Sequence, residues 1–154
     1  MNAFEIKNGS LHAENIALTE IAQEIGTPTY VYSAAHIKHQ FDALQGAMQR
    51  ALPADRQPLL CYACKANSNL AILSHLRSLG SGLEIVSHGE LLRGLKAGFA
   101  PEHIVSTGVG KTIIEIKALI EAGIHQINIE SLEELMRIGE VSTSLEKHIK
   151  VVFR

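Results

Sequence analysis

Tryptophan is absent from this sequence of 154 residues, aromatic residues make up only 5% of it, and cysteine occurs twice. Two cysteines are too few for the disulfide framework of a small secreted domain, so a reducing compartment is expected. No apolar run approaches the roughly 18 residues that a membrane-spanning helix needs. The opening MNAFEIKNGS has neither the basic nor the apolar region of a secretory signal. These absences predict a cytoplasmic protein with no membrane partner.

Neither sign of charge dominates, because 14 lysines and arginines stand against 16 aspartates and glutamates, a net charge of -2. The sequence therefore lacks the basic surface with which proteins bind nucleic acid. Apolar residues account for 46% and charged residues for 19%, which is typical of a globular domain of ordinary size. The sequence ends in an alternating apolar run at 148–154, without a turn after it. We therefore expect a chain that is shortened relative to a complete domain.

Short apolar runs alternate with segments of helical spacing from residue 59 onward. Strands are predicted at 59–64, 83–86, 104–106, 126–129 and 149–153, with leucine and isoleucine at helical intervals between them. Gly80, Gly98 and Gly123 follow three of the helices, at the left-handed position that favours glycine. Strand–helix units of this length indicate parallel strands covered by helices. A doubly wound sheet and a (β/α)8 barrel both fit, and four units plus a fifth strand make half a barrel.

The first third of the sequence has a different pattern. Its predicted elements are a hairpin with an Asn-Gly turn at 4–12, a helix at 18–25, a strand at 29–33 and a long amphipathic helix at 34–52. An antiparallel segment before an α/β array indicates an arm that belongs to another domain. We therefore predict an arm at 1–33 and the barrel part at 34–154.

Several short strings imitate known motifs. Cys61 and Cys64 have C-x-x-C spacing, but residues three apart on a strand point to opposite faces, so two buried structural thiols are expected. The string GVGKT at 108–112 lacks one glycine of the P-loop and one of the dinucleotide fingerprint, and it predicts a tight strand-to-helix turn. The eight histidines are scattered without acidic partners at ligand spacing, so no metal site is expected.

Two predicted helices begin with the same box, S-x-x-E. Ser87 precedes Glu90 by three residues, and Ser131 precedes Glu134 in the same way. In such a box the serine and the glutamate each satisfy a free backbone donor of the other residue. The boxes therefore predict helix starts directly after two strands, without any role in catalysis.

Lys65 closes an apolar strand at its carboxyl end, in the string CYACKAN at 61–67. Parallel α/β folds place their chemistry at that end of the strands. Strand alternation puts Lys65 on the same face as Ala63, whose small side chain leaves room beside the amine. Loss of solvation favours the neutral, nucleophilic amine that Schiff-base formation with an aldehyde requires. The alternative is a solvated lysine that merely ends a strand.

The string YACKANSNLAIL, followed in order by GLEIVSHGELLRGLKAG, IVSTGVGK and INIESLEELMRI, resembles the fold-type III pyridoxal-phosphate decarboxylases. Among these it is most similar to the diaminopimelate decarboxylases, and residues 1–33 resemble their amino-terminal arm. The resemblance implies a partial (β/α)8 barrel of the alanine-racemase type, with an arm belonging to a β-domain that this chain lacks. It also implies a homodimer with shared active sites. The implied reaction removes carbon dioxide from an amino-acid substrate, meso-diaminopimelate, to give L-lysine, with pyridoxal 5'-phosphate as cofactor.

The resemblance further implies roles for four residues. Lys65 matches the catalytic lysine that holds the cofactor, and Ala63 lies beside it. Glu84 stands where these proteins usually have an aspartate close to the cofactor, and its extra methylene alters that contact. Arg154 matches an arginine that approaches the phenolic oxygen of the cofactor. Further cofactor contacts follow position 154 in these proteins, so the chain as given is expected to be inactive.

Three other interpretations remain open. A related decarboxylase that acts on ornithine, arginine or carboxynorspermidine would share Lys65 and the helix-start boxes. A non-catalytic pyridoxal-phosphate protein would have the lysine but not the arm at 1–33. A structural fragment that pairs with other chains would bind no cofactor, and adding pyridoxal phosphate would then produce no visible absorption band.

Overall fold

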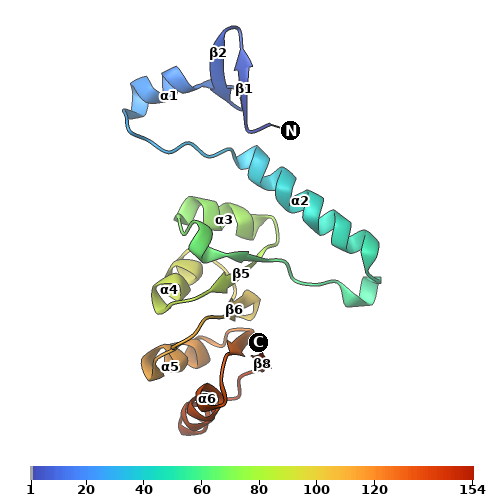
Figure 1. Ribbon diagram of the computed structural model, residues 1–154, viewed down its shortest axis with the longest axis vertical. Helices are drawn as coiled ribbons and strands as arrows, with labels where there is room; N and C mark the ends of the chain where they lie inside the picture. Colours follow the sequence, from blue (N-terminus) through green and yellow to red (C-terminus); the bar gives the residue numbers. More distant parts are fainter. Residues whose placement is uncertain (1) are drawn as a thin grey trace. The chain divides into compact units, whose positions relative to one another are not determined.

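The computed structural model describes residues 2–154, which divide between Gln57 and Pro58 into two compact units. Each unit has its own sheet (Figure 1), with three strands in the first and five in the second.

The first unit contains an antiparallel sheet followed by helices. Its elements are β1 (Phe4–Lys7), β2 (Ser10–Ala13), β3 (Ile16–Ala17), α1 (Leu18–Ile25), α2 (Ala34–Ala51) and the 3-10 helix η1 (Ala54–Arg56). Between β1 and β2, Asn8 and Gly9 have φ angles of 52° and 78°, and a two-residue hairpin turn with two positive φ angles favours these residue types. The predicted hairpin and both predicted helices are confirmed.

The strand predicted at 29–33 is wrong. These residues do not adopt a strand, and the side chains of Tyr30 and Tyr32 are exposed. Alternating apolar residues form a stable strand only where a neighbouring strand supplies hydrogen bonds and a core covers one face. None of the strands described in residues 2–154 pairs with this segment.

The second unit alternates parallel strands with helices. Its strands are β4 (Cys61–Ala63), β5 (Gly82–Ile85), β6 (Ile104–Ser106), β7 (Gln126–Ile129) and β8 (Val151–Phe153). Its helices are η2 (Cys64–Ala66), α3 (Leu70–Ser78), α4 (His88–Lys96), η3 (Pro101–His103), α5 (Ile113–Ala122) and α6 (Leu132–Ser144).

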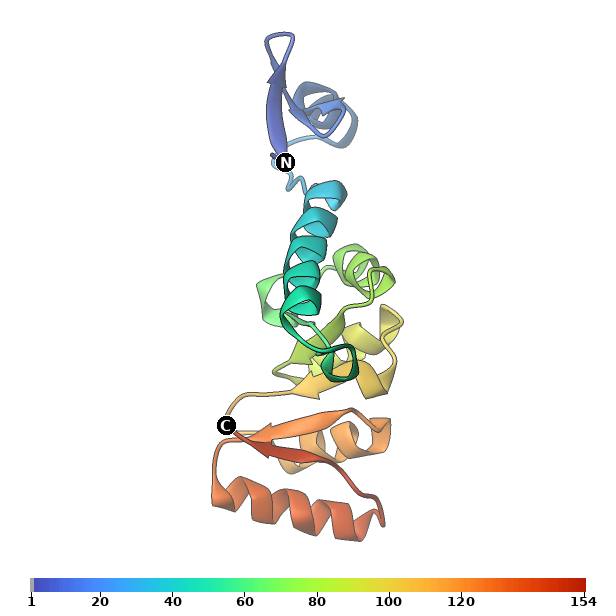
Figure 2. The same cartoon turned by 90° about the vertical axis from the view of Figure 1, so that its right-hand side faces the viewer.

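The order of the strands decides between the two folds that the pattern allowed. Neighbours in the sheet follow the chain, β4-β5-β6-β7-β8, and all pairs are parallel. Helices α3 to α6 lie on one face of this sheet (Figure 2). A doubly wound sheet reverses its strand order and carries helices on both faces, whereas a (β/α)8 barrel has sequential strands inside a ring of helices. The predicted partial barrel is confirmed.

The core of the second unit lies between the sheet and these helices. Fully buried strand residues include Leu83, Ile85, Ile104, Ile127 and Ile129, and they pack with helix residues that include Leu91, Ile116 and Ile138. Because side chains alternate along a strand, the residues between them face the other side of the sheet, which is the interior of a barrel. Ala63 and Glu84 lie on that interior face.

The predicted helix ends are confirmed at Gly80, Gly98 and Gly123, whose φ angles of 91°, 89° and 72° are left-handed. Each box serine, Ser87 and Ser131, also accepts a hydrogen bond from the backbone of its glutamate, as predicted.

The reciprocal half of each box differs from the prediction. The carboxylates of Glu90 and Glu134 accept hydrogen bonds from the backbone of Val86 and Glu130, one residue before the serine. Both serines have an extended backbone, with φ angles of -155° and -153°. A complete capping box begins α5, at Thr112-Ile-Ile-Glu115, and was not predicted although its spacing fits the pattern.

Candidate functional site

Strand alternation predicted Lys65 on the strand with Ala63. In the structure Lys65 instead lies in the 3-10 turn η2, just after that strand. Strand β4 ends at Ala63 because Cys64 turns into the core, where its side chain has no exposed surface. Lys65 itself is exposed, and its ammonium group has no hydrogen-bond or ion-pair partner in the described chain. The desolvation that the sequence argument expected is therefore not supplied by residues 2–154. What they provide is a free amine at the carboxyl end of β4.

Ala63 and Glu84 lie side by side on the interior face of the sheet. The two residues are paired in register between β4 and β5, and Glu84 is paired in turn with Val105 on β6. Lys65 follows Ala63 by two positions, so the amine, the small methyl group and the carboxylate come from two adjacent strand ends. The assignment of these three residues to a cofactor site stays a prediction.

Thr107 fixes the carboxylate of Glu84. Its hydroxyl group donates a hydrogen bond to Glu84 Oε1, and Thr107 is itself buried directly after β6. Thr107 is two residues beyond Val105, so it lies on the same face one layer closer to the carboxyl edge. Thr107 was not among the residues predicted for the site. A hydroxyl side chain at the end of the next strand was the available signal.

Arg154 follows β8 and continues its pairing, since its backbone N–H donates to the carbonyl of Ile129 at 3.0 Å. Its guanidinium Nη1 lies 3.3 Å from Glu130 Oε1. The arginine side chain is 60% exposed, and ion pairs in that setting contribute little stability. The contact nevertheless gives the guanidinium group a preferred direction along the carboxyl edge.

The predicted residues are thus spread along the carboxyl edge of a single parallel sheet. Lys65 and Ala63 belong to the β4 side and Arg154 to the β8 side, with β5, β6 and β7 between them. No hydrogen bond or ion pair joins Lys65, Glu84 and Arg154 to one another within residues 2–154. What they share is the carboxyl edge of the sheet, and strand alternation places Glu84 and Arg154 on its interior face.

Cys61 and Cys64 are free thiols, and only Cys64 belongs to the hydrophobic core. Burial raises the pKa of the Cys64 thiol to about 11. Burial also raises the pKa of Cys61, and the negative charge of Glu84 adds to this effect. Because the thiolate is the reactive form, both thiols are poor nucleophiles at neutral pH. Cys64 is buried as predicted, whereas Cys61 is only half-buried because it lies on the other face of the sheet.

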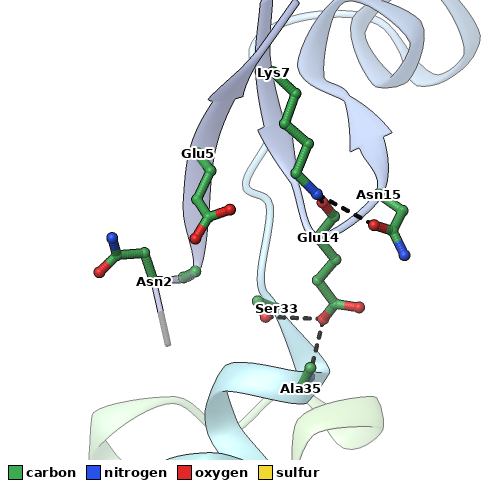
Figure 3. A pocket seen from close by; sticks show the side chains of 8 residues that line it. Asn2, Glu5, Lys7, Glu14, Asn15, Ser33 and Ala35 are labelled. Atoms are coloured by element: carbon green, nitrogen blue, oxygen red, sulfur yellow. Dashed lines mark hydrogen bonds between the residues drawn. The ribbon is translucent and has the colours of Figure 1, made fainter.

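A hollow of about 290 Å³ in the first unit contains none of the predicted residues (Figure 3). Its polar groups already bond to one another. Glu14 Oε1 accepts hydrogen bonds from Ser33 Oγ at 2.8 Å and from the backbone of Ala35 at 2.9 Å, and Lys7 Nζ donates to Asn15 Oδ1 at 3.2 Å. These contacts join the hairpin to the start of α2.

Across residues 2–154, no three histidine, cysteine, aspartate or glutamate side chains gather as metal ligands. In the same part of the chain, no helix is both long enough and apolar enough to span a membrane.

Residues 34–154 match a protein family described as pyridoxal-dependent decarboxylase, pyridoxal binding domain. The diaminopimelate decarboxylase of Pseudomonas aeruginosa is 46% identical over 145 residues, covering 94% of this chain and 34% of that protein. The diaminopimelate decarboxylase of Zymomonas mobilis is 42% identical over 154 residues, covering 100% of this chain and 36% of that protein.

Solved structures give the same result. The diaminopimelate decarboxylase of M. jannaschii, in complex with L-lysine, has a TM-score of 0.95 at 36% identity and covers 99% of this chain and 36% of its own. A lysine/ornithine decarboxylase from Vibrio vulnificus, 20% identical with a TM-score of 0.77, shares the fold. The chain spans about a third of the length of the relatives it matches. Since the family match runs from residue 34 to residue 154, the chain belongs to the pyridoxal-dependent decarboxylases.

Proposed function

We propose that this chain contributes the cofactor-holding lysine of a diaminopimelate decarboxylase, which releases carbon dioxide from meso-diaminopimelate to give L-lysine. The observation that carries the proposal is Lys65, an exposed amine without a partner in residues 2–154, at the carboxyl end of the strand paired with Glu84. Membership of the family implies pyridoxal 5'-phosphate, an aldehyde that reacts with such an amine. Relatives named for this activity are 46% and 42% identical to the chain.

The residues of the carboxyl edge have the chemistry that this cofactor needs. Lys65 Nζ is free to bond to the aldehyde carbon, and Ala63 leaves space beneath it because its side chain is a single methyl group. Glu84 supplies a carboxylate whose direction Thr107 fixes. Arg154 supplies a cation suited to an anionic phenolic oxygen, with Glu130 directing it. When bound, the cofactor withdraws electrons from the bond to the departing carboxylate.

Each of these residues then has a defined task. Lys65 would hold the cofactor through its Nζ, and the same amine, once free, would carry a proton to the substrate carbon. Glu84 offers its negative charge to the protonated nitrogen near the end of β4. Arg154 would offer its positive charge to the anionic oxygen of the cofactor. Orientation of the reacting bond by such contacts can lower a barrier by up to about 7–11 kcal/mol.

The choice of substrate rests on the relatives. Proteins 46% and 42% identical are named for diaminopimelate, whereas the lysine/ornithine enzyme is only 20% identical and shows the fold alone. We therefore place ornithine, arginine and carboxynorspermidine second, and parallel assays with each amino acid decide among them.

The proposal extends to the surroundings of the site. Residues 1–33 serve as an arm of a second domain, and the active protein is a cytoplasmic homodimer that shares its active sites. The support is that the relatives are about three times as long as this chain, so further contacts are supplied by other residues. Measuring the mass of the native protein tests the dimer.

Borohydride reduction tests the assignment of Lys65. The protein, in the form that its gene encodes, is loaded with pyridoxal phosphate, reduced, digested and mapped by mass spectrometry. We expect the pyridoxyl mass on the peptide that contains Lys65. We also expect Lys65→Ala to lose the visible absorption band and the release of lysine from meso-diaminopimelate.

Lys96 provides the matched control, since it is also exposed but lies in the last turn of α4, away from the carboxyl edge. Lys96→Ala should bind the cofactor and release lysine as the unaltered protein does. A pyridoxyl mass on Lys96 or Lys111 in place of Lys65 would contradict the assignment.

A further inference from the structure

A second lysine at the carboxyl edge is buried and has no task in the proposed reaction. Lys111 lies between β6 and α5 and is 6% exposed, and its Nζ is 3.1 Å from Oε1 of Glu134, which is equally buried. Removing two charges from water is unfavourable unless their partners are well placed, so a buried pair is weak support for stability alone. Its geometry indicates a more specific use.

The ammonium group of Lys111 joins three separate segments. It donates to the carbonyl of Gly108 at 2.7 Å, to the carbonyl of Asn128 at 2.9 Å and to Glu134 at 3.1 Å. An ammonium group has three donors, so all of them are used. The lysine thereby ties the segment after β6 to the end of β7 and to the first turn of α6.

Glu134 connects Lys111 to Glu130, the partner of Arg154. Its second oxygen, Oε2, accepts a hydrogen bond from the backbone of Glu130 at 2.9 Å. Glu130 in turn binds Arg154. At another of the three segments that Lys111 joins, Gly108 directly follows Thr107, which binds Glu84. The pair therefore fixes the two neighbours, Thr107 and Glu130, that direct the proposed cofactor contacts.

We propose that Lys111 is a positioning residue, whose buried pair with Glu134 holds the carboxyl-edge segments so that Glu84 and Arg154 face the cofactor. This inference rests on the proposed function of the site. Lys111 does not react with the cofactor itself, because every donor of its ammonium group is already bound. Its effect on cofactor binding passes through the backbone at Gly108 and at Glu130.

A double replacement separates positioning from stability. In Lys111→Met/Glu134→Leu the pair becomes apolar side chains of similar size, and such replacements often leave a protein as stable or more stable. The carbonyls of Gly108 and Asn128 then lose their common donor. We expect a variant that still melts cooperatively, at a moderately lower temperature because these backbone groups lose their partners, together with about tenfold weaker binding of pyridoxal phosphate and a shifted visible absorption band. Wild-type affinity and an unchanged band in a stably folded double variant would overturn the proposal.

Glu134→Gln is a second test that does not depend on the folding of the double variant. In glutamine an NH2 group, which cannot accept a hydrogen bond, replaces one carboxylate oxygen. The side chain keeps its shape but loses the hydrogen bond either from Lys111 or from the backbone of Glu130. Weaker cofactor binding is expected, and unchanged binding would overturn the proposal. Lys117→Met is the matched control, because Lys117 pairs with Glu121 at 3.8 Å on an exposed face of α5.

The two proposals can fail separately. Borohydride reduction of the unaltered protein is done first, and a missing label on Lys65 refutes the cofactor assignment. A label on Lys65, combined with wild-type affinity in both pair variants, refutes the positioning role of Lys111 alone.

Discussion

Replacing Gly94 by alanine should destabilise the protein, although the same change in an open helix position stabilises. Gly94 lies inside α4, against the sheet, and a Cβ added there would be 2.5 Å from Leu83 Cδ2 and 3.7 Å from Ile104 Cδ1. Leu83 has no exposed surface, so its side chain cannot turn into water to make room. Gly139, inside α6, offers the comparison, since an added Cβ there would meet nothing within 4 Å.

The expected change in the free energy of unfolding is the sum of two opposing contributions. Alanine is favoured over glycine in a helix interior by about 1 kcal/mol, and this gain is common to both positions. Forcing an extra methyl group into a packed core costs about 1–3 kcal/mol. Gly139→Ala should therefore stabilise by about 1 kcal/mol, whereas Gly94→Ala should range from neutral to about 2 kcal/mol destabilising. The difference between the two variants is the overpacking at Leu83.

Urea unfolding followed by circular dichroism measures both variants against the unaltered protein. In thermal melts the same difference would appear as about 2–4 °C for each kcal/mol. Equal stabilisation by both substitutions would mean that Leu83 repacks without cost. The close packing of α4 on β5, the strand that carries Glu84, would then be refuted.

Three further outcomes follow from the structure. Burial raises the pKa of Cys64 to about 11, so iodoacetamide at pH 8 should label this thiol only when the protein unfolds. Peptide mapping measures the labelling, and rapid labelling of the folded protein would contradict the burial of Cys64. Hydrogen bonds from the backbone and side chain of Thr112 lower the pKa of Glu115 below 4.5, so their stabilisation is complete above that pH and is lost as the pH falls through the folded pKa. Thr112→Ala should therefore lower stability by about 1 kcal/mol at pH 7 and by less at pH 3, and equal losses in urea unfolding at both pH values would refute the link. Thr107→Val should weaken pyridoxal-phosphate binding in a spectroscopic titration while Thr107→Ser preserves it, because only the serine keeps a donor to Glu84; equal affinities would show that the hydrogen bond does not position the carboxylate.

The partial barrel could be predicted because its signals are local and repeated. Apolar strands, helical spacing and the glycines after three helices each indicated the same alternation, and each element is stabilised by the neighbour that follows it in the chain. The strand predicted at 29–33 failed for the opposite reason. Its alternation was real, but no strand described in residues 2–154 supplies its hydrogen bonds.

The site was less predictable, because its contacts depend on which strand ends are neighbours. Nothing in the spacing of Thr107 and Glu84 along the chain, 23 residues apart, indicates that they share a hydrogen bond. The pairing of β5 with β6 in register brings them together. The sequence predicts only a tight turn around Lys111 for the same reason, since its partners Asn128 and Glu134 belong to the next strand and the helix after it.

The two lysines at the carboxyl edge differ in how many donors of their ammonium groups form hydrogen bonds. This number distinguishes an amine that holds the fold from one that is free to react. Lys111 uses all three donors, so bonding its nitrogen to a cofactor would leave two carbonyls and a buried carboxylate without a partner. Lys65 uses none within residues 2–154, and its reaction breaks no contact there. A lysine that must bond to a cofactor and leave it again in each cycle cannot also hold the fold. The two proposed roles, the reactive amine for Lys65 and the positioning residue for Lys111, thus rest on the same count of hydrogen bonds.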